Sequence, residues 1–328
     1  MPEPRLLTLG RANLDLYAQQ HGVAFADAIG WDAMVGGSPV NVALAAARLG
    51  VRAGVLTAVG ADLVGDWVLR ALTRQGVDTR FVARKAEAHT SLALRAQVAP
   101  DHPLAFYRHD PADIHLTADD LAGAPVERVP AVLVSADALA RGTTAAAARS
   151  VLARARGGTA TVYLDLDLRE VSWPGGAAYA RAVGAVVTEA DVILGTEEEF
   201  ATLLGLAADA DAAVVAEAVR ALSESAGAIA VLKRGAEGAA VLRPGREPRH
   251  VPAFDVAEAS TVGAGDSFAA GLIAARLNGS DWAEAGRFAG ACAAITVSRF
   301  GCSTGFPHLR EVSTFLRTRP ALTAMERS

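Results

Sequence analysis

Short apolar runs alternate with longer helical segments along most of the second half of this 328-residue chain. The pattern predicts buried strands at 131–135, 161–166, 191–194 and 229–233. It predicts helices at 143–156, 177–187, 197–204 and 214–225. Strands that alternate with helices of about 10–15 residues imply a parallel, doubly wound sheet. We therefore expect a single α/β domain over residues 1–328.

The first third of the chain departs from this rhythm. Buried strands are predicted at 5–10 and 51–59, a helix over 42–50, and a second helix that follows the 51–59 strand and runs through Leu72. Segments near 11–35 and 88–110 instead alternate polar and apolar residues, which is typical of half-exposed strands. We expect these two segments to form a small separate β-sheet that acts as a lid over a substrate.

Composition and charge exclude several classes of protein. The net charge is −5 and no long basic run is present, which argues against a nucleic-acid-binding surface. No apolar run reaches the roughly 18 residues of a membrane span, and no signal peptide is evident. The two cysteines, Cys292 and Cys302, indicate neither a disulfide framework nor a zinc site. A cytoplasmic location is expected.

The segment 260–268 reads Ser-Thr-Val-Gly-Ala-Gly-Asp-Ser-Phe and precedes an apolar helical pattern. Gly263, Ala264 and Gly265 predict a tight turn into a buried helix, whose first N–H groups can bind an anion. Asp266 has two interpretations. It is a helix N-cap, a frequent position for Asp. Alternatively, it is a base that takes a proton from a hydroxyl while neighbouring amides stabilise charge on a phosphoryl group.

Two weaker motifs lie in the N-terminal part of the chain. Gly36-Gly37 followed by Asn41 is either a simple turn into a helix or a glycine wall on which a polyol lies, with Asn41 bonding its hydroxyls. Asp15, on a predicted lid strand, is either a solvated side chain or an acceptor for two sugar hydroxyls.

Two further motifs follow predicted strands. Lys233, Gly235 and Gly238 belong either to a hairpin-like turn or to a glycine-rich bend under a nucleotide. Glu199 stands in the first turn of a predicted helix, where an acid favours the helix dipole. The alternative is that Glu199 holds a hydrated Mg²⁺ together with ATP phosphates.

Arg108 and Arg169 lie beside predicted strands, where an unpaired guanidinium is costly to bury. Each either forms a salt bridge with Asp113 or Asp165, or binds a substrate carboxylate in a bidentate manner.

Taken together, the order of these motifs resembles the ribokinase-like (PfkB) carbohydrate kinase family over about residues 5–308. The resemblance implies a mainly parallel sheet with a small β lid, MgATP as donor, and transfer of the γ-phosphate to a sugar hydroxyl. It maps the base onto Asp266 and the anion hole onto residues 263–265. The sugar contacts map onto Asp15, Gly37 and Asn41. Whether a monovalent cation also binds stays open, because Ser260 stands where the family usually has Asp.

Within that family, segments 195–200 and 165–173 and the pair Tyr107-Arg108 look most like the 5-dehydro-2-deoxygluconokinases of inositol catabolism. The 2-keto-3-deoxygluconate kinases are the nearest alternative, and a fructokinase or ribokinase type also stays open. Both favoured substrates are sugar acids, which suits arginines near the site. The resemblance also implies a homodimer joined through the lid. A sugar sensor that lost the transfer step is disfavoured, because the Gly-Ala-Gly-Asp motif is intact.

Overall fold

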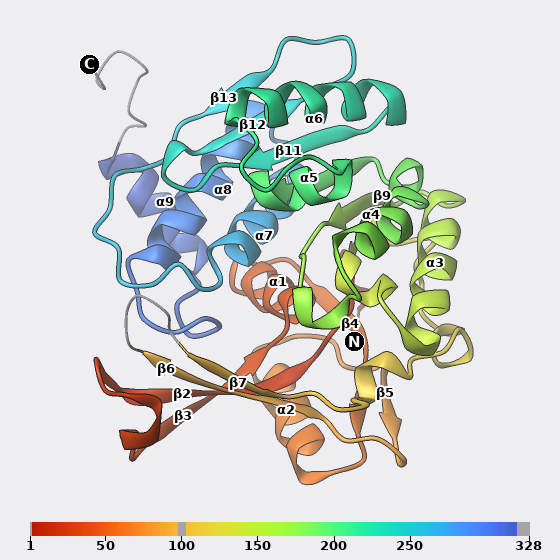
Figure 1. Cartoon of the computed structure of the whole chain (residues 1–328), viewed down its shortest axis with the longest axis vertical. Helices are drawn as coiled ribbons and strands as arrows, with labels where there is room; N and C mark the ends of the chain where they lie inside the picture. The colour runs from red at the N-terminus through yellow and green to blue at the C-terminus, as the bar shows by residue number, and fades with distance from the viewer. Residues whose placement is uncertain (1, 98–102, 320–328) are drawn as a thin grey trace.

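The computed structural model describes residues 2–97 and 103–319, and within these residues the strands form two sheets (Figure 1). The larger has the order β13-β12-β11-β10-β9-β8-β1-β4-β5. Its strands are β1 (Leu6–Leu9), β4 (Ala53–Gly60), β5 (Val82–Lys85), β8 (Ala131–Ser135), β9 (Thr161–Asp165), β10 (Val192–Thr196), β11 (Ile229–Lys233), β12 (Ala239–Leu242) and β13 (Arg249–Val251). The smaller sheet comprises β2 (Asn13–His21), β3 (Trp31–Gly36), β6 (Ser91–Gln97) and β7 (Leu104–Tyr107).

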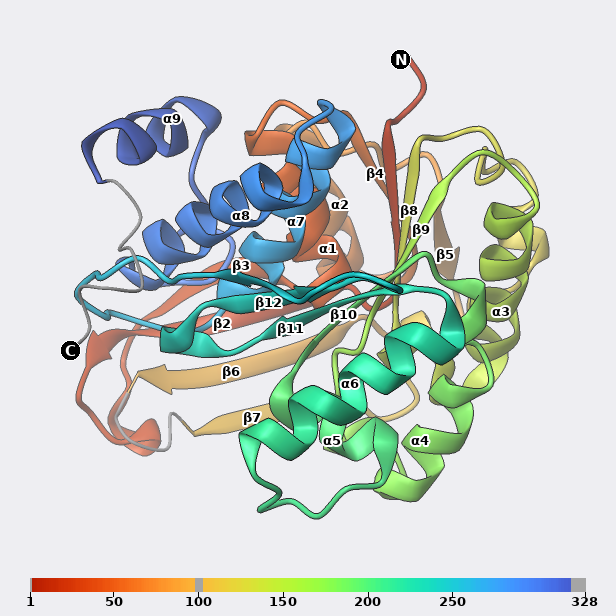
Figure 2. The ribbon, with the colours of Figure 1, turned by 90° about the horizontal axis from the view of Figure 1, so that it is seen from above.

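The large sheet is parallel except at one edge, where β12 pairs antiparallel with both β11 and β13. Helices cover both of its faces (Figure 2). On one face lie α1 (Ser38–Arg48), α2 (Leu63–Arg74), α7 (Ala264–Leu277) and α8 (Trp282–Val297), with α9 (Leu309–Thr318) packed on α8. On the other lie α3 (Gly142–Arg156), α4 (Gly176–Gly184), α5 (Glu197–Leu204) and α6 (Ala212–Ala226). The predicted doubly wound fold is confirmed.

Burial on two faces explains the apolar runs of the central strands. All eight residues of β4 and all five of β8 are buried. Along β1, Leu6 packs into the core under α1 and α7, whereas Leu7 packs into the core under α3. A parallel sheet covered on both sides requires continuous apolar strands rather than alternating ones.

The small sheet is built on the alternating segments, as predicted. Its order is β3-β2-β6-β7, and β2 pairs antiparallel with β3 but parallel with β6. Residues 98–102, which belong to the expected lid, lie outside the described residues. The prediction that two copies pair through this sheet stays a prediction.

Several elements were not predicted. The short strand β5 was missed because three of its four residues are half-buried and one is exposed, so no apolar run marks it. Helix α8 has a recognisable start, because Asp281 and Glu284 form a reciprocal capping box. Among the described helices, none is long and apolar enough to cross a membrane.

Candidate active site

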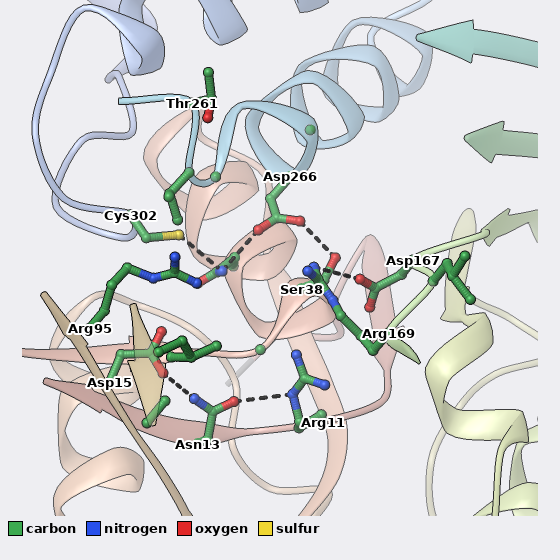
Figure 3. Close-up of a pocket in the computed structure, with 18 of the residues that line it drawn as sticks. Arg11, Asn13, Asp15, Ser38, Arg95, Asp167, Arg169, Thr261, Asp266 and Cys302 are labelled. Atoms are coloured by element: carbon green, nitrogen blue, oxygen red, sulfur yellow. Dashed lines mark hydrogen bonds and ion pairs between the residues drawn. The ribbon is translucent and has the colours of Figure 1, made fainter. Parts of the chain in front are cut away.

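A cavity of about 610 Å³ lies between the carboxyl edge of the large sheet and the small sheet (Figure 3). Asp165, Thr196 and Lys233, at the ends of β9, β10 and β11, contribute to its wall. Strand order in the large sheet reverses between β8 and β1, and α/β proteins bind ligands beside such switch points. The first turns of α1 and α7 complete the wall.

Asp266 faces this cavity from the third residue of α7. The N-cap of α7 is Gly263, whose φ of 82° is left-handed, and no side chain caps the helix. The N-cap interpretation of Asp266 is therefore wrong. Its carboxylate instead accepts hydrogen bonds from α1: Ser38 Oγ donates to Oδ1 at 2.6 Å, and Asn41 Nδ2 donates to Oδ2 at 2.9 Å.

The electrostatic environment makes Asp266 more basic than an ordinary aspartate. Burial raises the pKa of Asp266, the hydrogen bond from Ser38 opposes that rise, and the charge of Asp167 adds to it. The balance leaves the pKa above its usual range. A carboxylate with a raised pKa is a stronger proton acceptor, which favours the interpretation of Asp266 as a base.

Positive charge gathers beside the first turn of α7. Residues 263–265 form the turn, and a Cβ built on Gly265 would lie 3.6 Å from Lys233 Nζ. Lys233 Nζ lies 3.3 Å from Asp165 Oδ1. Burial acts to lower the pKa of Lys233, but Asp165, Glu199 and Asp266 together outweigh it, so the ammonium stays charged. A helix N-terminus with an adjacent ammonium forms a site for a phosphate group.

The other two residues of the lysine motif lie away from the cavity wall. Gly235 is exposed in the turn after β11, and nothing lies within 4 Å of a Cβ built on it. Gly238 has φ 89°, and a Cβ there would overlap the carbonyl oxygen of Val251 on β13. The left-handed φ of Gly235, 53°, and the close approach of Val251 to Gly238 both favour glycine in this turn. The nucleotide contact expected of them stays a prediction.

Asp15 faces the cavity from β2, on the same face as Asn13 and Tyr17. Burial raises the pKa of Asp15 to about 6, with Arg11 and then Arg95 opposing the rise. A side chain on Gly36 would overlap the Asp15 carboxylate, and one on Gly37, whose φ is 104°, would overlap the backbone of Arg11. The two glycines thus leave room for Asp15 and for the chain entering α1, where Asn41 lies in the first turn.

The two arginines predicted to bind a carboxylate have different environments. Arg169 lines the cavity with a 47% exposed side chain and pairs with Asp167 at 2.7 Å, rather than with Asp113 or Asp165. Arg108 is absent from the cavity wall. Its side chain is 7% exposed, and its Nη1 lies 2.7 and 2.5 Å from the two carboxylate oxygens of Asp113. The salt-bridge alternative is therefore the correct one for Arg108.

Asp167 connects Arg169 to the large sheet. Its φ of 26° is left-handed, an uncommon backbone conformation for a residue other than glycine. Ser135 Oγ donates to Asp167 Oδ2 at 2.7 Å. Burial acts to raise the pKa of Asp167, but Arg169, Arg11, Lys233 and the hydrogen bond from Ser135 together keep the pKa below its usual range. Asp167 therefore stays ionised and holds Arg169 at the cavity wall.

Sequence reasoning missed two arginines of the cavity wall. Arg11 follows β1, and its Nη1 contacts Asp137 Oδ2 at 2.9 Å while its Nε donates to Asn13 at 3.2 Å. Arg95 lies on β6 opposite Tyr17 of β2. Figure 3 shows its side chain extending into the cavity between Asp15 and Cys302. The alternation along β6 places Arg95 on one face with Ala93, but only the pairing with β2 shows that this face lines the cavity.

Glu199 also faces the cavity, as the third residue of α5. Its Oε2 accepts the Thr196 N–H at 2.7 Å in a capping box, and its Oε1 accepts the Leu168 N–H at 3.2 Å. Among the described residues, no group of three or more acidic, His or Cys side chains forms a metal site. Glu199 can thus contribute one contact to a metal ion held mainly by a ligand's phosphates.

Comparison with known proteins identifies the family. The profile of the pfkB family carbohydrate kinases matches residues 3–309. This chain belongs to the pfkB family. The match spans both sheets and helices α1 to α8 of the described residues, and it confirms the family resemblance seen in the sequence motifs. The protein is accordingly a carbohydrate kinase, a phosphotransferase that uses an alcohol group as acceptor.

Individual pfkB relatives align over nearly the whole chain. The 5-dehydro-2-deoxygluconokinase of Halalkalibacterium halodurans is 28% identical over 97% of this chain and 96% of its own length. The 5-dehydro-2-deoxygluconokinase 2 of Bacillus cereus is 31% identical over 95% of this chain and 94% of its own length. The structure of fructokinase with bound ATP from Xylella fastidiosa superposes with a TM-score of 0.83, at 25% identity over 96% and 99% of the two chains.

Proposed function

We propose that this kinase transfers the γ-phosphate of ATP to the terminal hydroxyl of 5-dehydro-2-deoxy-D-gluconate. One observation carries the choice of a sugar acid: Arg11, Arg95 and Arg169 all line the cavity that contains Asp266. The cavity wall also carries acidic side chains, which would repel an anionic acceptor unless cations balance them. They are Asp15, Asp165, Asp167, Glu170, Glu199 and Asp266. The relatives named above make this sugar acid the first choice, and 2-keto-3-deoxygluconate is the alternative.

The acceptor's polar groups have matching partners in the cavity. The carboxylate of Asp15 accepts hydrogen bonds from two hydroxyls. Asn41 Oδ1 is buried and has no hydrogen-bond partner among the described residues, so a third hydroxyl that reaches it would satisfy it. Gly37 lets the acceptor lie against the backbone. With its hydroxyls held here, the acceptor presents its carboxylate to the arginines and its terminal hydroxyl to Asp266.

In the transfer step, Asp266 takes the proton of the acceptor's terminal hydroxyl. The hydroxyl oxygen forms a bond to the γ-phosphorus as the bond from that phosphorus to the β–γ bridging oxygen breaks, and ADP leaves. The N–H groups of the first turn of α7 and the ammonium of Lys233 stabilise the charge on the transferred group. Mg²⁺, when bound with ATP near Glu199, supplies neutralisation of phosphate charge.

The test is ATP consumption by the purified protein with a panel of acceptors. The panel contains 5-dehydro-2-deoxygluconate, 2-keto-3-deoxygluconate, gluconate, fructose and ribose, and product phosphorylation is followed by phosphorus NMR. We expect the highest kcat/KM with 5-dehydro-2-deoxygluconate. A higher kcat/KM with fructose or ribose would contradict the choice of a sugar acid.

A further inference from the structure

Ser38 is the first residue of α1, and its hydroxyl is directed at Asp266 rather than at its own helix. The side chain is buried, with 4% of the residue exposed, yet it forms part of the cavity wall. Its Oγ lies 2.6 Å from Asp266 Oδ1 (Figure 3). No side chain caps α1, so this hydroxyl serves the carboxylate and not the helix end.

The same helical turn supplies a second donor. Asn41 Nδ2 donates to Asp266 Oδ2 at 2.9 Å and also lies 3.2 Å from Cys302 Sγ. The Asn41 N–H donates to the Gly37 carbonyl, which fixes the turn. Each carboxylate oxygen of Asp266 thus accepts one bond from α1. A carboxylate has about four acceptor positions, so each oxygen retains a lone pair for another donor.

Building on the proposed function, we propose that Ser38 is a positioning residue for phosphoryl transfer, whose hydroxyl orients the Asp266 carboxylate toward the acceptor's hydroxyl. The torsion that rotates a carboxylate is soft and has a broad range. Two donors on one rigid turn of α1 restrict it. Errors of about 1 Å in the placement of reacting groups cost on the order of a hundredfold in rate. The proton of Ser38 stays on its oxygen throughout.

Ser38, like Asn41, carries no charge, unlike the titratable groups near Asp266. The titratable groups whose charges act on Asp266, or are acted on by it, come from β2, β9, the segment after β9, β11 and the segment after α8: Tyr17, Asp165, Asp167, Arg169, Lys233 and Cys302. Replacing Ser38 with Ala leaves all of these charges in place. A change in the titration of Asp266 then reports the lost hydrogen bond.

The experiment measures kcat, KM and the pH dependence of kcat with the sugar acid for Ser38→Ala and Ser38→Thr. In Ser38→Ala, kcat is expected to fall about tenfold to a hundredfold, while KM and ATP affinity change less than about twofold. The acidic limb of the plot of kcat against pH is expected to move to higher pH by about one unit. The lost hydrogen bond favoured the ionised form of the Asp266 carboxylate. Ser38→Thr keeps the hydroxyl and should return the limb to its wild-type position.

Ser223→Ala is the matched control. Ser223 lies on α6, is 1% exposed, and donates to the Ala228 carbonyl at 2.6 Å, outside the cavity. This variant should lose stability without moving the acidic limb. If Ser38→Ala does not fold, Ser38→Cys, whose thiol is a weak donor, takes its place with the same expectation.

The failure of the Ser38 proposal and the failure of the proposed kinase function give different experimental results. Wild-type kcat and an unmoved acidic limb in Ser38→Ala, with transfer to the sugar acid intact, would overturn the positioning role alone. A wild-type enzyme that does not phosphorylate sugar acids would contradict the proposed function, and the Ser38 comparison would then be made with the acceptor it does phosphorylate.

Discussion

Arg108 and Asp113 form a buried ion pair in which Nη1 lies 2.7 Å from Oδ1 and 2.5 Å from Oδ2. Their side chains are 7% and 2% exposed. The pair joins the segment after β7 of the small sheet to the short helical turn 112–114. An arginine that looked like a specificity residue in the sequence is therefore an ion-pair partner within the fold beside the small sheet.

We predict that Arg108→Ala lowers the free energy of unfolding by about 3–5 kcal/mol, because it leaves Asp113 buried without its partner. Chemical denaturation with urea measures this. The double variant Arg108→Ala/Asp113→Ala leaves no buried charge at the pair and should be more stable than Arg108→Ala alone. Unchanged stability in Arg108→Ala would show that the pair contributes nothing to the folded state.

In contrast to Arg108→Ala, Arg95→Ala should weaken acceptor binding and leave the stability of the fold nearly unchanged. Because Arg95 extends into the cavity beside Asp15, we expect its loss to raise KM for the sugar acid by about ten- to a hundredfold, the equivalent of one charge-assisted hydrogen bond of about 1.5–3 kcal/mol. The melting temperature should change little. Steady-state kinetics with the sugar acid and with fructose, alongside Arg95→Lys as the charge-retaining control, distinguish binding of the carboxylate from a general loss of activity.

Asp266→Asn tests the base. Asn retains the size of the side chain and an oxygen that accepts from Ser38, so the protein should fold. It cannot take the hydroxyl proton, and kcat should fall by about 10²–10⁴. ATP affinity should persist, because the N–H groups at the start of α7 and Lys233 remain. A folded variant that retains more than about a tenth of the wild-type kcat would show that Asp266 is not the base.

Acceptor binding should depend on pH through Asp15. Its pKa is raised from 3.8 to about 6 by burial, so the carboxylate is protonated below about pH 6 and loses its capacity to accept two hydroxyl donors. Affinity for the acceptor, measured by calorimetry without nucleotide, should be constant from pH 8 to 7. It should weaken below pH 6 by up to about tenfold per unit. Asp15→Asn should bind more weakly and show no such dependence.

The same shift predicts a change in stability with the opposite sign. A group whose pKa is higher in the folded protein binds a proton there that the unfolded chain has already released. The free energy of unfolding should therefore fall as pH rises from 3.8 to about 6, by the contribution of Asp15. The difference between wild type and Asp15→Asn over this range isolates that contribution.

Closure of the small sheet over the acceptor is a further prediction. Asp15 and Arg95 reach the cavity from β2 and β6, so an acceptor that binds both ties the small sheet to the large one. Phosphoryl transfer also requires that water be excluded from the site. Amide hydrogen exchange in β2, β3, β6 and β7 should slow when the acceptor and a non-hydrolysable ATP analogue are both bound. Unchanged exchange in these strands would contradict closure.

The sequence alone determined the layered fold and the start of the helix that carries Asp266. The apolar run 131–134 coincides with all of β8 but its last residue, Ser135, because a strand buried on both faces is apolar at nearly every position. The Gly-Ala-Gly-Asp motif likewise predicted the start of α7. The residue before this helix, Gly263, has a left-handed φ of 82°, and glycine adopts this conformation without steric cost. These properties depend on neighbours along the chain.

Only the tertiary structure decided which side chains meet at the site. Arg95 and not Arg108 lines the cavity, because the pairing of β6 with β2 places Arg95 opposite Tyr17 on the inner side of the small sheet. Ser38 and Asp266 are separated by 228 residues, and they meet because α1 and α7 pack with their first turns together. Periodicity within a segment shows which residues share a face. What that face contacts depends on packing between distant segments, which local sequence does not encode.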